Sequence, residues 1–483
     1  MCETMSAIVI GVLVAYFALL MVVSRYRTMG QGEDNDSFFM ASRGASWWMV
    51  SIGMIGASVS GVSFVSVPGM VQGIGFKYLQ TALGFILGYV LIANVLLPVY
   101  YRLESPSIYD FLRRRFGVSA YKTGAWYFLV SKLLGTAAKV YVIVLVLHAL
   151  AFEAVGMPFG VSVAVVVGMI WLYTRRGGLN AIVWTDVLQT VCMVVALVMI
   201  IVWFAGELGL DAAGVADVAM NSRWSDYFEW DDWTSKQHFV KQFVSGAFIA
   251  LVMTGLDQDM IQKNRAIRTL EQSKRNMYCY GVAFVPLNFL FLLLGVLLLQ
   301  YADVNGVVLP AKPDEYLPFF VKEGYFGVVA SVCFVVGVVS ATFSSADSSL
   351  TSLTTSYCVD IAERRDDVQY RKKVHVVFSL LLVGVIGLIR LWNDASLIDL
   401  IYVMVSYTYG PLLGLFAFGL FTSRAVRDRA VPYIAIASPL LCYVIDVAVN
   451  VLWGYRMGYE LLLLNGAITY GGLWAVSRKQ EVK

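Results

Sequence analysis

The stretch "SATFSSADSSLTSLTTSYCVDI", residues 340–361, decides how this chain folds. It carries eleven Ser and Thr hydroxyls and the carboxylate of Asp347, yet it continues directly from the apolar run "GVVASVCFVVGVV", residues 327–339. Such a run is typical of a membrane-buried helix, where a carboxylate is costly and by default marks an ion or proton path. We therefore predict one helix whose first half is held in the membrane and whose second half lines a polar interior.

The polar groups of this predicted helix share one face, because residues three, four and seven positions apart lie on the same side. Small residues also let membrane helices pack closely, and this simpler interpretation accounts for a few of the hydroxyls. It does not account for Asp347, whereas hard cations such as Na⁺ prefer oxygen ligands of this kind. The face consists of Ala341, Ser344, Ser345, Ser348 and Ser352, with Asp347 and Thr351 at its edge.

Composition places the whole chain in a membrane. The 483 residues are 59% hydrophobic and 14% charged, against about 25% charged residues in an ordinary soluble domain. This predicts a polytopic, all-α membrane protein, which we place in the plasma (cytoplasmic) membrane. The net charge of +3 indicates no nucleic-acid partner, and the six cysteines lack the spacing of a disulfide framework or a transition-metal site. No nucleophile–base arrangement or phosphate loop is found, so we expect neither an enzyme nor an organic cofactor.

Thirteen apolar stretches are long enough to cross a bilayer as helices. Alternate loops carry about 26 of the 36 Lys and Arg residues, and the positive-inside rule places that basic set in the cytoplasm. The N-terminus is then outside and the C-terminus inside. The predicted spans are residues 6–24, 47–71, 79–101, 123–150, 158–174, 181–205, 239–260, 277–300, 325–357, 374–391, 397–422, 431–453 and 459–476.

Two of these spans are expected to be interrupted. The second contains "GASVSGVS", residues 56–63, and clusters of glycine and serine weaken a helix. Unwound backbone at the bilayer midplane lines a cavity, where its freed carbonyls coordinate cations. An intact, closely packed, glycine-rich helix is the alternative. In the seventh span Asp257, Gln258 and Asp259 follow Gly255, which suggests a second interruption.

Another carboxylate, Asp186, lies a few residues inside the sixth predicted span, in "RRGGLNAIVWTDVLQ", residues 175–189. A solvated side chain, or a partner of Arg175 or Arg176, is the simpler interpretation. The alternative is a buried position that faces the polar helix.

Five motifs in order make the chain resemble the sodium:solute symporter family, whose members carry sugars, proline, sialic acid, iodide and monocarboxylates. They are "WW…GASVSGVSF", "GGLNAIVWTDVLQ", "TGLDQDMIQK", "SSADSSLTSLTTSYCVDI" and "SYTYGP". The resemblance implies a LeuT-type fold with two inverted five-helix repeats, residues 47–205 and 239–422. Residues 6–24 then form an extra N-terminal helix and residues 431–476 two C-terminal helices, all within one transporter domain, residues 1–483.

The same resemblance implies a sodium-coupled symporter that imports a small organic solute by alternating access. Its principal sodium site falls, position by position, on residues of the second and ninth spans. These are the backbone oxygens of Gly56, Val59 and Ala341 and the hydroxyls of Ser344 and Ser345.

A second cation site, which some members of the family have, falls on Asp186, Asp347 and Ser348. Asp347 departs from the family, in which a hydroxyl is expected at this position. Two neighbouring carboxylates would hold one Na⁺ more tightly, or one of them would carry a proton. Proton-coupled symport therefore stays open as an alternative.

The resemblance also implies that the solute binds beside the break in the second span. Lys139 either pairs with Asp257 as a structural contact, which we favour, or meets a solute carboxylate. A glucose-like solute is disfavoured, because Ser58 replaces the asparagine of the family's sugar carriers and the eighth span has no lysine. A membrane sensor built on the same fold is a further alternative. A sensor would need an appended domain, and we expect none. The expected solute contacts are Ser58, Ser63, Lys139, Asp257, Gln258 and Tyr402.

Overall fold

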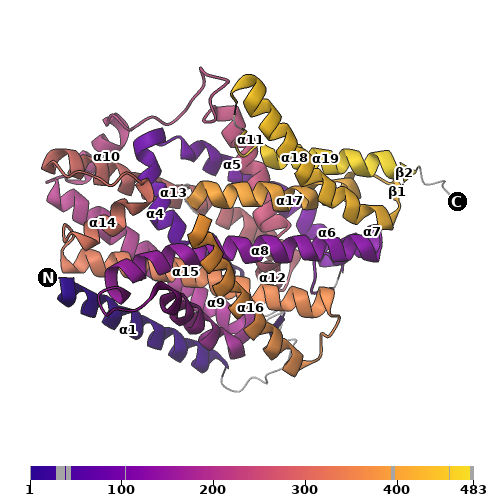
Figure 1. Ribbon diagram of the computed structural model, residues 1–483, viewed down its shortest axis with the longest axis horizontal. Coiled ribbons are helices and arrows are strands. Elements are labelled where there is room, and N and C mark those ends of the chain that lie inside the picture. The colour runs from indigo at the N-terminus through magenta and orange to yellow at the C-terminus, as the bar shows by residue number, and fades with distance from the viewer. Residues whose placement is uncertain are drawn as a thin grey trace.

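The computed structural model describes residues 2–28, 38–39, 45–103, 105–392, 397–455 and 457–478. Helices dominate this part of the chain (Figure 1), because backbone in a membrane must form its hydrogen bonds within its own segment. A two-residue antiparallel pairing joins β1 (Ala425–Val426) to β2 (Ser477–Arg478). The longer helices are α1 (Cys2–Thr28), α3 (Trp47–Ser58), α4 (Gly61–Ile74), α5 (Tyr78–Leu91), α8 (Val118–Leu147), α9 (Phe159–Glu207), α11 (Phe239–Ala250), α13 (Leu270–Asn305), α15 (Val328–Ser356), α16 (Val368–Trp392), α17 (Leu397–Phe421), α18 (Val431–Trp453) and α19 (Leu461–Val476).

Shorter helices connect or extend these. They are α6 (Leu97–Leu103), α7 (Asp110–Arg115), α10 (Ala212–Asn221), α12 (Gln258–Arg265) and α14 (Tyr316–Lys322), with π-helical turns at Ile92–Leu96, His148–Phe152, Leu251–Gly255 and Tyr357–Ile361.

Nine helices among the described residues are long and apolar enough to cross a membrane, and two bent pairs raise this number to eleven. Two shorter apolar helices, Phe159–Arg175 and Leu461–Val476, coincide with the remaining predicted stretches. The helical membrane architecture is thus confirmed. The number of thirteen crossings, the orientation of the termini and the boundaries of the two repeats stay predictions.

One helix assignment, α9 (Phe159–Glu207), covers the fifth and sixth predicted spans. Its two apolar parts, Phe159–Arg175 and Ala181–Glu207, are separate candidate spans and coincide with the predicted residues 158–174 and 181–205.

The predicted interruption of the second span is confirmed. Helices α3 and α4 meet at a 61° bend, where Val59 and Ser60 have extended backbone. Gly61 begins α4 at a point where an added Cβ would clash with the hydroxyl of Thr342 on α15. Glycine is therefore required here for the close approach of the two segments.

The interruption of the seventh span is confirmed as well. The helix Phe239–Gly255 and α12 meet at a 65° bend. Asp257 has extended backbone in the break and caps α12, because its carboxylate accepts the backbone N–H of Asp259 at 2.9 Å. The break turns α12 toward the interior, where it contacts α3 and α15.

The polar helix α15 occupies the middle of the bundle, against α9, α8, α3 and α1. Figure 1 shows α1 along one edge and α18 and α19 at the opposite edge, where α19 packs on α17. From Val338 to Ser356 every side chain of α15 is buried. The hydroxyl-rich half therefore faces protein on all sides, as the sequence predicts.

The connection between α9 and α11 folds back onto the turn between α4 and α5. The ammonium of Lys77 lies 2.7 Å from the Asp226 carboxylate and 2.8 Å from that of Glu229. Hydrogen bonding to Lys77 lowers the pKa of Glu229 below its ordinary value. The backbone N–H of Phe76 also donates to the carbonyl of Asp226 at 2.9 Å. These contacts give the connection between α9 and α11 a structural role.

Candidate cation and solute sites

The break between α3 and α4 and the polar helix α15 meet directly. A Cβ added to Gly56 would lie 3.3 Å from the Ser344 hydroxyl oxygen and would clash with the Thr190 hydroxyl. The predicted sodium ligands Val59 and Ala341 are each 1% exposed. The structure therefore brings the two segments of the predicted principal site together, with the hydroxyl of Ser344 turned toward α3.

Both hydroxyl ligands predicted for this site have polar partners. The Ser344 hydroxyl donates to Oδ1 of Asp186 at 2.6 Å, and the Ser345 hydroxyl oxygen accepts from the ammonium of Lys139 at 3.0 Å. The predicted principal site is thus bordered by the Asp186 carboxylate at Ser344 and by the Lys139 ammonium at Ser345.

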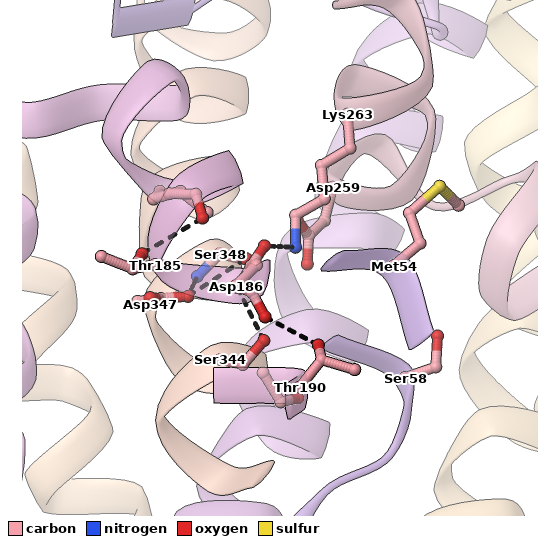
Figure 2. A network of polar contacts seen from close by, with 12 residues as sticks. Met54, Ser58, Thr185, Asp186, Thr190, Asp259, Lys263, Ser344, Asp347 and Ser348 are labelled. Carbon is pink, nitrogen blue, oxygen red and sulfur yellow. Dashed lines mark hydrogen bonds and ion pairs between the residues drawn. The ribbon is translucent and has the colours of Figure 1, made fainter. Parts of the chain in front are cut away.

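Asp186 lies at the centre of a buried polar network (Figure 2). Its Oδ2 atom is 2.7 Å from the ammonium of Lys263, and both side chains are almost completely buried. Thr190, one turn further along α9, donates to the carbonyl of Asp186 at 2.7 Å and to that of Ile52 on α3 at 3.0 Å. Asp186 is therefore not solvated, and its ion-pair partner is a lysine of α12.

Asp347 faces the same region from α15, as Figure 2 shows, but has a different set of partners. Its carboxylate accepts from the Tyr173 hydroxyl at 2.9 Å, from the backbone N–H of Ser348 at 2.5 Å and from the Ser348 hydroxyl at 3.1 Å. No lysine or arginine of the described residues forms an ion pair with Asp347. The predicted second site thus contains one carboxylate with an ammonium partner and one without.

Beside the break lies a cavity of about 110 Å³ that is lined by residues of α3, α4, α5, α8, α11, α13 and α17. Five of the six predicted solute contacts line it, namely Ser58, Ser63, Lys139, Asp257 and Tyr402. The sixth, Gln258, is placed elsewhere. Its amide accepts from the backbone N–H of Ile108 at 3.0 Å and donates to the carbonyl of Pro106 at 2.7 Å. Gln258 therefore holds a connecting loop and does not line this cavity.

Two lysines of α8 face this region, and the structure distinguishes them. Lys132 lies 3.1 Å from the Asp257 carboxylate and 2.8 Å from that of Asp259. The Tyr409 hydroxyl also donates to Asp257, at 2.7 Å. Lys139, by contrast, has the hydroxyl of Ser345 as its partner, and no carboxylate of the described residues pairs with it. The favoured interpretation, in which Lys139 pairs with Asp257, is therefore wrong, because Lys132 takes that position.

Tyrosine hydroxyls complete the cavity wall, and sequence reasoning identified only one of them. The hydroxyls of Tyr78 and Tyr402 lie 2.8 Å apart and join α5 to α17. Tyr280 links Ser58, at 2.5 Å, to Tyr89, at 3.0 Å. In the sequence these tyrosines are indistinguishable from packing residues, since their spacing has no particular signal.

Sequence reasoning also missed Lys263, which it placed in a basic cytoplasmic loop. The side chain is 2% exposed because the bend after Gly255 turns α12 inward. A signal was available in the spacing of Asp259 and Lys263, which share one face of a helix four residues apart.

Comparisons with known proteins agree with this geometry. The model of the sodium:solute symporter family matches residues 38–432. The human sodium/iodide cotransporter is 27% identical over 84% of this chain and 65% of its own, so this chain spans about two thirds of that relative. The sodium/sialic acid symporter NanT of Aliivibrio fischeri is 26% identical over 86% of this chain and 84% of its own. Sodium-coupled monocarboxylate transporter 1 of Xenopus laevis is 24% identical over 84% and 67%.

Solved structures share the fold. An outward-open, substrate-bound Na⁺-coupled sialic acid symporter superposes with a TM-score of 0.82 at 19% identity, covering 98% of this chain and 99% of the other. A nucleobase-cation-symport-1 family transporter, MHP1, gives a TM-score of 0.59 at 14% identity, covering 90% and 94%. The predicted LeuT-type fold class is thereby confirmed.

Proposed function

The chain belongs to the sodium:solute symporter family, and on that premise we propose that it is a Na⁺-coupled symporter that imports a small organic monoanion, a carboxylate above all. The family consists of transporters, and the matched relatives are sodium-coupled carriers of iodide, sialic acid or monocarboxylates. The membrane that this protein spans is proposed to be the plasma membrane.

The ammonium of Lys139 is the observation that carries the proposed solute class. It lines the cavity beside the broken helix and has no carboxylate partner among the described residues. An ammonium at membrane depth is costly unless it is paired or functional. A solute carboxylate in the cavity supplies a negative charge as its partner, whereas Asp257 is already paired with Lys132.

The size of the cavity favours a short solute. Its volume of about 110 Å³ is well below the roughly 300–1,000 Å³ of sites for drug-sized ligands. Aliphatic or aromatic monocarboxylates with few atoms suit this space better than a complete sugar acid. The surrounding tyrosine hydroxyls, Tyr78, Tyr89, Tyr280 and Tyr402, offer donors to the second carboxylate oxygen or to a solute hydroxyl.

We propose that Na⁺ binds where the broken helix meets α15. The backbone oxygens of Gly56, Val59 and Ala341 and the hydroxyls of Ser344 and Ser345 are its ligands, as the family resemblance implies. The contact between Gly56 and Ser344 supports this assignment. Carbonyls freed at a helix break are the usual cation ligands in transporters with such breaks.

A second monovalent cation is proposed beside Asp347 and Ser348. Because Lys263 neutralises Asp186, the carboxylate of Asp347 is the one that lacks a cation. A proton on Asp347 is the alternative occupant, and a proton-coupled symporter is therefore the second candidate function. The absence of a lysine or arginine partner for Asp347 among the described residues is the specific observation that favours it.

The proposed transport cycle follows from linkage. Na⁺ and the solute bind to adjacent sites formed by the same broken helix, so each raises the affinity for the other, typically by about 1–3 kcal/mol of coupling free energy. Loss of Na⁺ on the side where its concentration is low then weakens solute binding and releases both.

Thermal stabilisation of the purified protein tests the solute class. Propionate, lactate, nicotinate, iodide, glucose and proline are each added with Na⁺ or with N-methyl-D-glucamine as the cation. We expect a small monocarboxylate to raise the melting temperature when Na⁺ is the cation, and not when N-methyl-D-glucamine replaces it. Stabilisation by glucose or proline, without any response to the anions, would overturn the proposal. Uptake into proteoliposomes, driven by either a Na⁺ or a pH gradient, then separates sodium coupling from proton coupling.

A further inference from the structure

We propose that Lys139 is the residue that couples the two cargoes, by exchanging the hydroxyl of Ser345 for the solute anion when Na⁺ binds. This inference rests on the proposed function and assigns its coupling step to one side chain. In the absence of Na⁺ the ammonium is held by Ser345. When Na⁺ takes that oxygen, the ammonium turns into the cavity and becomes the binding group for the anion.

Lys139 lies between the solute cavity and the proposed sodium site. Its side chain lines the solute cavity and at the same time donates to Ser345, a proposed sodium ligand, at 3.0 Å. Lys132 lies seven residues earlier, two turns away on a similar face of α8, but it is held between Asp257 and Asp259. Only the later lysine therefore contacts both sites.

Charge repulsion opposes the presence of Na⁺ and of the Lys139 ammonium at Ser345 at the same time. A small hard cation lies on the order of 2.4 Å from its oxygen ligands, so Na⁺ on Ser345 would be close to an ammonium only 3.0 Å from the same oxygen. Two positive charges at such a separation repel strongly at the effective dielectric constant of a protein interior. The neighbouring carboxylates relieve this repulsion only in part, because none of those described pairs directly with Lys139: Asp257 and Asp259 share Lys132, and Asp186 pairs with Lys263.

The effects of Na⁺ and of the anion on each other's binding are reciprocal. An anion in the cavity compensates Lys139 and so removes the penalty on Na⁺, and Na⁺ on Ser345 frees the ammonium for the anion. Each cargo therefore lowers the cost of binding the other by the same factor. The lysine thus makes Na⁺ bind weakly when it is alone, and this predicts an effect of mutation in an unusual direction. Removing the charge should strengthen Na⁺ binding.

The test is a Na⁺ titration of purified protein, followed by the melting temperature, in sulfate salts at constant ionic strength with N-methyl-D-glucamine as the replacement cation. Wild-type protein, Lys139→Gln, Lys139→Met and the charge-retaining control Lys139→Arg are compared, each with and without propionate or the most effective anion of the solute screen. Two neutral variants are included so that a folding defect in one of them leaves the other informative.

We expect the anion to lower the half-saturating Na⁺ concentration of the wild type by about tenfold, which is within the usual range of coupling. In Lys139→Gln and Lys139→Met, the half-saturating Na⁺ concentration should already be about tenfold lower without anion and should no longer respond to it. Lys139→Arg should keep the weak Na⁺ binding of the wild type.

Weaker or unchanged Na⁺ binding in both neutral variants would overturn the coupling role of Lys139. This outcome is distinct from failure of the proposed function. If the wild type binds Na⁺ but responds to no anion, the proposed solute class is wrong, and the Na⁺ affinity of Lys139→Gln without anion still decides whether the lysine opposes the ion.

Discussion

The ammonium of Lys263 lies 2.7 Å from the carboxylate of Asp186, and neither side chain has appreciable contact with solvent. The two residues come from different halves of the chain, on α12 and α9, and Ser344 of α15 joins them by donating to the other carboxylate oxygen at 2.6 Å. This pair therefore ties three helices together beside the proposed sodium site.

Replacement of Lys263 by Met should destabilise the protein by about 3–5 kcal/mol, because it leaves a buried carboxylate without its partner. Na⁺ should restore part of this loss, since Asp186 is then free to bind a cation. The melting temperature of Lys263→Met is measured in Na⁺ and in N-methyl-D-glucamine. The double variant Lys263→Met/Asp186→Asn is the control, and it should be more stable than the single variant and lose the additional response to Na⁺. Equal destabilisation of single and double variants would show that the pair is not the cause.

Replacement of Gly56 by Ala should abolish Na⁺-dependent stabilisation and destabilise the protein by about 1–3 kcal/mol, as overpacking of a tight interior does. The added Cβ would clash with the Thr190 hydroxyl and lie 3.3 Å from that of Ser344. Gly73 of α4 is the matched control, because an added Cβ there meets nothing within 4 Å. Gly73→Ala should be neutral or stabilise by roughly 0.5–1 kcal/mol. The melting temperatures of both variants, with and without Na⁺, check the prediction, and equal tolerance of the two substitutions would contradict it.

Replacement of Asp347 by Asn should lower by one the number of positive charges moved per solute. Its carboxylate is buried and lacks a lysine or arginine partner among the described residues, so it is available to a transported Na⁺ or proton. The reversal potential of solute-dependent current in proteoliposomes measures the stoichiometry, with the wild type measured in parallel. An unchanged reversal potential would exclude a transported cation at this residue.

Much of this arrangement was predictable because it depends on local chemistry. A cluster of glycine and serine weakens the helix at residues 56–63, and polar residues follow Gly255 at residues 257–259, so both interruptions could be placed from the sequence. The period of the hydroxyls likewise identified the polar face of α15. The partners of the charged groups could not be predicted in this way. Which of Lys132 and Lys139 reaches Asp257 depends on how α8 is rotated and positioned against α12, and this is set by tertiary packing.

The buried position of Lys263 could not be predicted from the sequence either. In the sequence it belongs to a basic segment, and the positive-inside rule placed that segment in the cytoplasm. The direction in which α12 leaves the 65° bend is not a property of its own residues, and the bend is what carries the lysine to Asp186.

Replacement of Ser344 or Ser345 by Ala should raise the Na⁺ concentration required for half-maximal uptake by about tenfold or more, because each substitution removes one oxygen ligand and such contacts with a charge contribute roughly 1.5–3 kcal/mol. Ser349 is the matched control on the same helix, since its hydroxyl donates to the carbonyl of Ser345 at 2.7 Å and is not a proposed ligand. Ser349→Ala should leave the Na⁺ dependence close to that of the wild type. Initial rates of uptake into proteoliposomes over a range of Na⁺ concentrations provide the measurement. Because Ser345 also anchors Lys139, its variant should in addition lose part of the dependence of Na⁺ affinity on the solute, whereas Ser344→Ala should keep it. If neither serine variant changes the Na⁺ dependence, the principal sodium site is assigned to the wrong residues.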